Sequence, residues 1–300
     1  MKRRIIKLGE ATLVASLPSK WSKKYGLKGG DEVEVIEQGK NLLISTMKEV
    51  AGDKKTITIK SPAEFLNRFI RAPYCYGYEE VEVRFSDPAV LPLINEYLNL
   101  LLGFEIVDQG EGYVVIQMVA KGMEGDFDKI LRRFMMILCN MSKEIPEAIR
   151  KKDKNMLVQI MSMESITNKL SNFCERMLNK NGYEDIKKTN FLFCFCWSAE
   201  QISDSMKEIC SLMLEKDAYR KGTSEDTLGA LSGFSGLLES YSRLFYNPSN
   251  EGMVSFKKDY MALEKDIYGM ISSRSEDEKR ILFNILKMTD LLRHLSISLI

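Results

Sequence analysis

The chain has 300 residues, 45% of them apolar, and a formal net charge of +1. That length and composition predict roughly two or three domains with buried cores. The longest apolar run, residues 191–197, is far too short to cross a bilayer, so we expect a cytoplasmic protein without membrane insertion. One histidine in the whole chain excludes a His-rich metal site and disfavours Ser-His-Asp or Cys-His catalysis, so we expect no enzyme.

The six cysteines show neither a CxxC pair nor the spacing of a zinc site. Two of them, Cys194 and Cys196, stand two apart in a helical pattern, where their side chains point in different directions. We therefore expect reduced thiols, most of them in the core of a cytoplasmic protein.

Positive charge is concentrated at the start of the chain. Residues 1–28 hold eight basic residues and one acidic residue, a net charge of +7. Residues 29–120 hold 8 basic and 15 acidic residues, a net charge of −7, and residues 121–300 are close to neutral. Such a patch favours binding to the phosphate backbone of a nucleic acid. A solvated basic surface is the alternative, since runs of charge usually face water.

Short strand patterns occupy the first 46 residues. We predict strands over residues 3–7, 12–17, 32–36 and 42–44, and a short helix capped by Ser19 and stopped by Gly26. A two-stranded hairpin is marginal by itself, so we expect two copies of the chain to interleave their hairpins as a dimer.

Four short motifs in this stretch, namely 7–9 (KLG), 16–18 (SLP), 20–21 (KW) and 30–35 (GDEVEV), resemble the AbrB/SpoVT swapped-hairpin DNA-binding domain. The resemblance covers residues 2–46. It implies a swapped-hairpin β-barrel that dimerises and binds double-stranded DNA. Carried over by position, the DNA-binding residues it implies are Arg3, Arg4, Lys7, Lys20, Lys23 and Lys24.

The sequence pattern of residues 54–120 predicts a small α/β domain. Strand patterns cover residues 56–60, 80–85, 104–107 and 113–119, and the last two form a hairpin across 110–112. Helices are predicted after Ser61, a cap followed by proline and glutamate, and after Asp87. No phosphate-binding loop stands out, and we expect a packing or spacer domain.

From residue 122 onward the pattern is entirely helical. The predicted helices cover residues 125–152, 155–181, 186–220, 224–246, 250–272 and 276–300. Short connections predict antiparallel neighbours, arranged as one bundle or as two three-helix bundles.

Two of these helices repeat the pattern E-x-I-x-[ND]-x-[LM]-x-x-[FI]-C, starting at Glu164 and at Glu200. At about 100° per residue, the apolar positions of each copy form one stripe. We therefore expect the pairs Glu164–Asn168 and Glu200–Asp204 to face outward. Oxygen ligands at this spacing can hold a hard cation, although a solvated acidic face is the alternative.

The repeat resembles the PhoU family, whose paired three-helix bundles carry metal-binding ExxxD motifs, over residues 124–300. The whole chain resembles archaeal PhoU-like regulators with an AbrB-type domain in front. Asn168 stands where the ExxxD motif has aspartate. The second bundle keeps no clear ExxxD motif, and its nearest match has Asp290 at the first position and His294 at the aspartate position. The resemblance implies an iron, zinc or magnesium ion on the helical domain, held by Glu164, Asn168, Glu200, Asp204, Asp290 and His294.

The sequence thus predicts a multi-domain α+β protein with an AbrB-like domain at 1–47, a small α/β domain at 54–120 and PhoU-like all-α bundles at 124–300. Our first hypothesis is a DNA-binding transcriptional regulator linked to phosphate uptake or homeostasis. The alternative is a PhoU-type signalling adaptor of phosphate transport in which the first domain serves only dimerisation. Expected partners are double-stranded DNA, a second or further copy of the chain, and phosphate-transport or signalling proteins.

Overall fold

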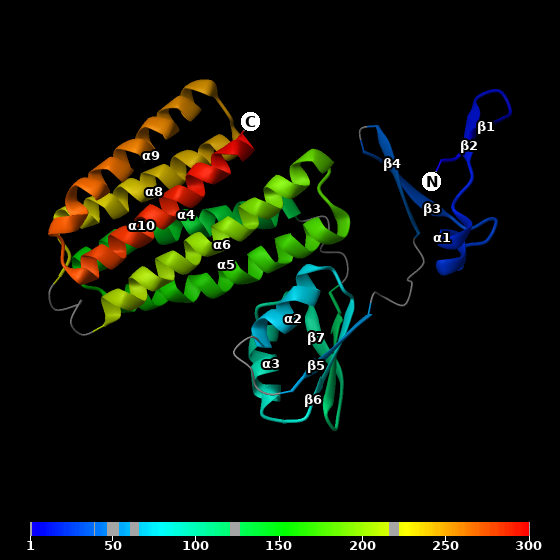
Figure 1. Cartoon of the computed structure of the whole chain (residues 1–300), viewed down its shortest axis with the longest axis horizontal. Helices are drawn as coiled ribbons and strands as arrows, with labels where there is room; N and C mark the ends of the chain where they lie inside the picture. The colour runs from blue at the N-terminus through cyan, green and yellow to red at the C-terminus, as the bar shows by residue number, and fades with distance from the viewer. Residues whose placement is uncertain are drawn as a thin grey trace. The chain divides into compact units, whose positions relative to one another are not determined.

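We analysed a computed structural model of the chain, which describes residues 2–38, 40–46, 54–60, 66–120, 127–215 and 222–299. The expected helix start at Ser61 therefore lies outside the described residues. The chain divides into two compact units, Met1–Asp53 and Lys54–Ile300, shown in Figure 1. No helix among the described residues has the length and apolarity needed to cross a membrane.

Two separate hairpins and a short helix make up the first unit. Strands β1 (Ile5–Leu8) and β2 (Thr12–Ala15) pair antiparallel, as do β3 (Val33–Gln38) and β4 (Asn41–Thr46), with α1 (Ser19–Lys24) between them. Each sheet has only two strands, so the described part of one chain forms no closed barrel. The predicted cap was wrong: Pro18 is the N-cap residue, and Ser19 is already the first helical residue.

The hairpins of the first unit leave their apolar side chains in solvent. Leu13 is 67% exposed and Leu42 is 64% exposed. None of the residues in 2–46 whose burial is described is buried. A hairpin with one or both faces uncovered has little to stabilise it in water. The first unit therefore lacks a core of its own among these residues.

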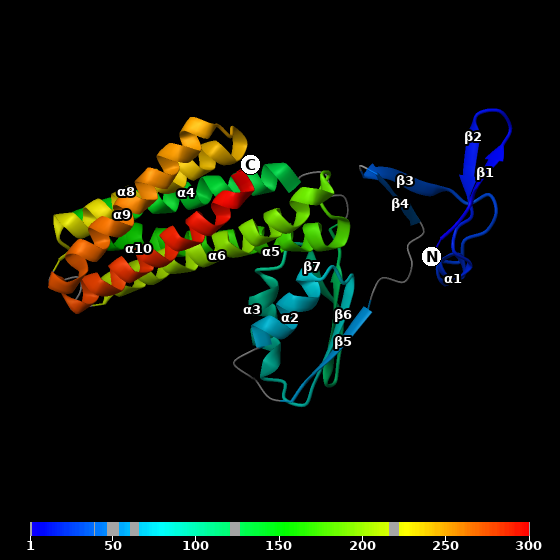
Figure 2. The same cartoon turned by 45° about the horizontal axis from the view of Figure 1, so that its top comes forward.

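The second unit begins with a mixed α/β layer. It consists of β5 (Lys54–Ile59), α2 (Leu66–Cys75), β6 (Glu80–Phe85), α3 (Val90–Leu98), β7 (Phe104–Gly110) and β8 (Tyr113–Met118). The strand order is β5-β6-β8-β7, with β5 and β6 parallel and the other pairs antiparallel. Figures 1 and 2 show α2 and α3 on one face of this sheet. Asp87 lies just before α3, where its carboxylate accepts a hydrogen bond from Ala89 N at 2.9 Å.

Six long helices follow, close to the predicted bounds except that the third ends before residue 220 and the sixth before residue 300. They are α4 (Phe127–Lys151), α5 (Lys154–Asn181), α6 (Ile186–Leu214), α8 (Glu225–Tyr246), α9 (Asn250–Met270) and α10 (Glu276–Leu295), with 3₁₀ turns η2 (Ile271–Ser273) and η3 (Ser296–Leu299). Side-chain oxygens at Asp153, Asp185, Ser224, Ser249 and Ser275 cap five helix starts.

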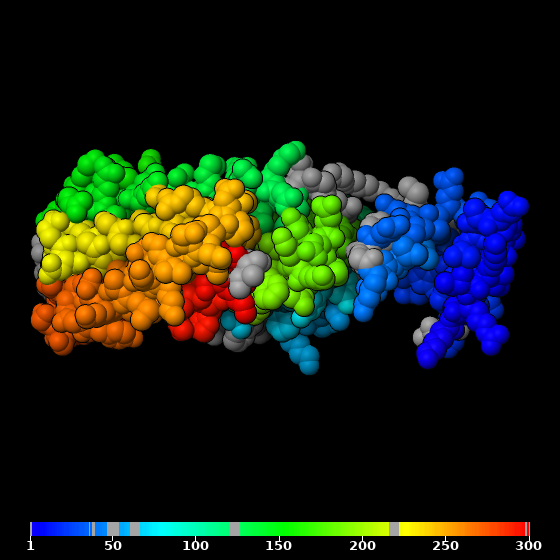
Figure 3. Space-filling view, turned by 90° about the horizontal axis from the view of Figure 1, so that it is seen from above, coloured from blue at the N-terminus to red at the C-terminus, as the bar shows by residue number. Residues whose placement is uncertain are grey.

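The six helices share one continuous apolar core. Helices α4 to α6 form one antiparallel set and α8 to α10 another, and the two sets meet along α4 with α8 and along α6 with α10. Figure 3 shows α8, in yellow, lying along the green α4. All six cysteines are free, and Cys75, Cys174, Cys196 and Cys210 are buried, as the cysteine pattern predicted for most of them.

Helix α5 joins the α/β layer to the helical bundle. Arg176 of α5 is 2% exposed, and its guanidinium donates to Tyr74 O at 2.9 Å, Tyr78 O at 2.8 Å and the Glu79 carboxylate at 2.7 Å. Asn179 donates to Cys75 O at 2.8 Å, one turn further along the helix. These contacts explain why residues 54–300 form a single compact unit.

The starts of α8 and α10 meet at Glu278. Its carboxylate accepts hydrogen bonds from Ser224 N and Thr227 Oγ1, both at 3.0 Å, and from Ser275 Oγ at 3.1 Å. Burial alone would raise the pKa of Glu278, but these hydrogen bonds lower its pKa to about 2. The ionised form therefore stabilises the fold above its ordinary pKa, and that contribution is lost as the pH falls towards 2.

We expect Glu278→Gln to lower the free energy of unfolding by about 1–2 kcal/mol at pH 7, because an amide accepts these hydrogen bonds less strongly than a carboxylate. Urea unfolding at several pH values checks this. The difference from the native protein should narrow as the pH falls below about 4.5. A difference that stays constant down to pH 3 would show that the carboxylate charge is not the stabilising feature.

Candidate functional site

The two copies of the repeated pattern face each other on adjacent helices. Glu164 and Asn168 lie on α5, and Glu200 and Asp204 lie on α6, which pack side by side. The four residues come together. Burial raises the pKa of the Asp204 carboxyl, and the charge of the Glu164 carboxylate raises that pKa further. The structure thus gathers these four predicted site residues at one place.

The predicted orientation of the α5 pair was wrong. Glu164 is 4% exposed, while Ile166, expected on the apolar stripe, is 40% exposed. The physical reason is that α5 is covered on more than one side, by α4 and α6 and by α2 of the α/β layer. On α6 the predicted stripe is confirmed, because Ile202, Met206 and Ile209 are all buried.

Lys207, which the sequence analysis did not single out, neutralises the buried Glu164. Its ammonium group lies 2.9 Å from Glu164 Oε2, and Asn168 Nδ2 donates to Glu164 Oε1 at 2.8 Å. Asn168 Oδ1 is then left buried without a hydrogen-bond partner. Lys207 follows Asp204 by three residues, a spacing that places both on the same side of α6 and could have identified it.

Glu200 lies near Arg71 of α2. At this place the α/β layer packs against α5. Arg71 donates to both oxygens of Glu175, at 2.9 and 3.0 Å, and its Nε donates to Asn172. Burial and then the charge of Asp204 raise the pKa of Glu200 to about 7, against the opposing effect of Arg71. Glu200 is therefore easier to protonate in the fold than in the unfolded chain.

We expect Glu200→Gln to stabilise the protein at pH 8 by about 1–3 kcal/mol and to leave it unchanged at pH 4. The folded chain keeps the Glu200 proton up to about pH 7. Stability of the native protein should therefore fall as the pH rises from about 4.5 to 7, and glutamine removes that loss. Thermal melts across this range check it, with Glu208→Gln on the exposed side of the same helix as the control. Equal melting temperatures of the native and Glu200→Gln proteins at pH 8 would contradict the raised pKa of Glu200.

The remaining predicted metal ligands lie on α10. Asp290 contacts Arg293, and His294 Nε2 lies 3.5 Å from Asp290 Oδ2. Within the described ranges, no group of three or more His, Cys, Asp or Glu side chains has an arrangement that could hold a metal ion. With Lys207 already paired to Glu164, the donors that best fit a hard cation are Glu200, Asp204 and the unpartnered Asn168 Oδ1. Metal binding stays a prediction, which metal analysis of the purified protein by mass spectrometry checks.

The six predicted DNA-binding residues all belong to the first unit and are exposed. They are Arg3 and Arg4 ahead of β1, Lys7 in β1, and Lys20, Lys23 and Lys24 in α1. Lys24 lies over the Tyr25 ring, 5.0 Å from its centroid. In the part of the chain that the structure describes, none of the six forms an ion pair with a carboxylate.

No family model matches the sequence, and no curated protein matches it. One solved structure is similar: the phosphate transport system regulatory protein PhoU from Streptococcus pneumoniae. The match has 15% sequence identity and a TM-score of 0.45, and covers 59% of this chain and 92% of that chain. At this level of similarity we draw no functional conclusion from the match.

Proposed function

We propose that the chain works as a dimeric regulatory protein, in which residues 2–46 join two copies and the helical bundle binds a signalling partner. The proposal rests on the exposed apolar surface of the first unit. Eight large apolar side chains of this unit are exposed: Ile5, Ile6, Leu8, Leu13, Val14, Val35, Leu42 and Leu43. Fully burying one such side chain contributes about 1.5–3 kcal/mol, so pairing two copies offsets the cost of ordering the hairpins.

The face that supports pairing most clearly belongs to the β3–β4 hairpin. The antiparallel register places Val35 opposite Ile44 and Glu37 opposite Leu42. Because side chains alternate across a strand, Val33, Val35, Leu42 and Ile44 share one face, and Asn41 lies on the other face. An interleaved second copy would cover this face, which carries more apolar side chains than the opposite face with Asn41 and Leu43.

Leu42→Asp tests the dimer against a matched control, Asn41→Asp, which adds the same charge one residue away. We expect Leu42→Asp to convert the full chain to a monomer at micromolar concentration, because it buries a charge without a partner. Asn41→Asp should leave the dimer intact. Light scattering gives the mass in each case, and a Leu42→Asp protein with unchanged mass would overturn the role of this hairpin.

The regulatory role follows from the resemblance of the repeat to the PhoU family. It gains support from the fold, because the two copies of the repeat meet on adjacent helices rather than on separate parts of the bundle. We propose an adaptor of phosphate transport that acts through protein contacts. Removing the gene from its host should make phosphate uptake insensitive to the phosphate supply. Unaltered control of uptake in the deletion strain would overturn this role.

DNA binding by the same dimer is a second candidate, favoured by one specific observation. The basic residues of the first unit are exposed and carry no carboxylate partner among the described residues. A dimer doubles their number on one particle, and contact with several phosphates makes affinity fall steeply with salt. A titration of random duplex DNA at several salt concentrations separates this role from dimerisation alone. Absence of binding at low salt would leave the adaptor role and overturn DNA binding.

A further inference from the structure

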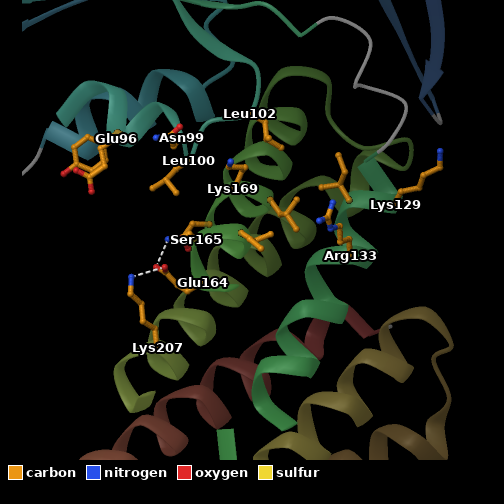
Figure 4. A pocket seen from close by; sticks show the side chains of 15 residues that line it. Glu96, Asn99, Leu100, Leu102, Lys129, Arg133, Glu164, Ser165, Lys169 and Lys207 are labelled. Carbon is orange, nitrogen blue, oxygen red and sulfur yellow. Dashed lines mark hydrogen bonds and ion pairs between the residues drawn. The ribbon is translucent and has the colours of Figure 1, made fainter. Parts of the chain in front are cut away.

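A broad pocket opens between the α/β layer and the helical bundle, and the Glu164–Asn168 pair of the repeat forms part of its lining. Its volume is about 1170 Å³, which is ample for a ligand the size of a nucleotide. Figure 4 shows Lys129 and Arg133 of α4 on one side, Glu96, Asn99 and Leu100 on the other, and Ser165 and Lys169 of α5 between them. All of these residues belong to the second unit.

The charge of the pocket is positive. Four basic residues line it, Lys129, Arg133, Lys169 and Lys207, against two carboxylates, Glu96 and Glu164. Glu164 is already neutralised by Lys207 at 2.9 Å. Neither Arg133 nor Lys169 forms an ion pair with a carboxylate of the described residues, so both cations are available to an anion. Guanidinium and ammonium groups are the side-chain cations that commonly bind phosphate in proteins.

Apart from Asn99, Ser165 and Asn168, the uncharged part of the lining is apolar or aromatic. Tyr97, Leu100 and Leu102 come from the α/β layer, and Ile130, Ile166 and Leu170 come from α4 and α5. Ile166 is 40% exposed at this surface, although it belongs to the repeat whose other apolar residues are buried. A pocket with apolar walls and a few polar groups is the usual form of a small-molecule site, in which the polar groups orient the ligand.

We propose that this pocket binds a small organic phosphate with an aromatic or apolar body, a nucleotide being the representative class. Arg133 and Lys169 hold the phosphate, and Tyr97, Leu100 and Ile166 cover the body of the ligand. Asn99 and Ser165 supply hydrogen bonds to its polar edge. Because α3, α4 and α5 all contribute, the ligand would bridge the α/β layer and the bundle.

Calorimetric titration of the full chain with ATP, adenosine and inorganic phosphate tests the proposal, with EDTA present so that no divalent cation links the ligand to the protein. We expect ATP to bind, and adenosine and phosphate each to bind at least tenfold more weakly, because each uses only one part of the lining. Phosphate binding as tightly as ATP would overturn the assigned role of the apolar wall. Absence of ATP binding at millimolar concentration would overturn the proposal.

A double variant, Arg133→Glu with Lys169→Glu, should weaken ATP binding at least tenfold while the melting temperature and the mass of the dimer stay unchanged. Lys257→Glu with Lys258→Glu, on the exposed face of α9, makes the same change in charge outside the pocket and should have no effect. Equal ATP affinity in both double variants would show that binding lies elsewhere on the chain. Because dimerisation is measured separately, this failure is distinct from a failure of the proposed regulatory function.

Discussion

Replacing Arg3, Arg4 and Lys7 together by alanine is expected to weaken binding to duplex DNA by about two orders of magnitude at low salt. The substitutions remove three positively charged side chains from each copy of the chain, and therefore six from the dimer. Each lost phosphate contact should also reduce the slope of the logarithm of affinity against the logarithm of salt concentration by about 0.9. Fluorescence anisotropy of a labelled random duplex, repeated over a range of salt, measures both quantities.

A matched variant separates this effect from a general change in charge. Lys257, Lys258 and Lys265 are exposed on α9, and replacing them by alanine removes the same charge from the second unit. The DNA-binding hypothesis predicts little change in affinity or salt slope for that variant. If both triple variants weaken binding equally, the attraction is a property of net charge, and the hairpin unit is not the DNA-binding surface.

Arg176→Ala is expected to lower the free energy of unfolding by about 3–5 kcal/mol, the largest stability effect that the structure predicts. The substitution removes three hydrogen bonds. Tyr78 O loses the Arg176 donor, and Tyr74 O keeps only the hydrogen bond from Gly77 N at 3.0 Å. It also removes the contacts of the guanidinium with the Tyr74 and Phe104 rings, at 5.1 and 5.3 Å from their centroids.

Urea unfolding measures this loss, and Arg150→Ala is the control. Arg150 forms an exposed ion pair with Glu225 at 3.2 Å, and such a pair contributes no more than about 1 kcal/mol. The loss of stability for Arg176→Lys should lie between the losses for Arg176→Ala and Arg150→Ala. An ammonium group keeps the charge but cannot reproduce the planar fork of the guanidinium. Equal stability of the Arg176→Ala and Arg150→Ala proteins would show that the junction at α5 does not hold the α/β layer on the bundle.

The helices and strands could be predicted from signals between neighbouring residues. Four of the long helices begin directly after residues of a type that commonly caps a helix, Asp153, Ser224, Ser249 and Ser275. The breaks between the predicted helices contain glycine, asparagine, proline or serine. The strand at Glu80–Phe85 agrees with its alternating pattern to the residue. These features depend on neighbours within a few positions, which is the range that a sequence pattern reports.

Contacts between distant segments could not be predicted in the same way. Arg176 reaches Tyr74, 102 residues earlier in the chain, and Arg71 reaches Glu175, 104 residues later. The repeated pattern on α5 and α6 predicted a shared site, but a single helical stripe could not show that α5 is covered on more than one side. Glu164 is buried in this packing, and Lys207 is its counter-ion at 2.9 Å.

The mass of the full chain in solution tests the central claim most directly. One copy has a mass of 34.4 kDa. Sedimentation equilibrium at micromolar concentration should give twice that mass or a higher even multiple, because the apolar hairpin faces of residues 2–46 need a second copy to cover them. A single species of 34.4 kDa that persists as the concentration rises would contradict the account.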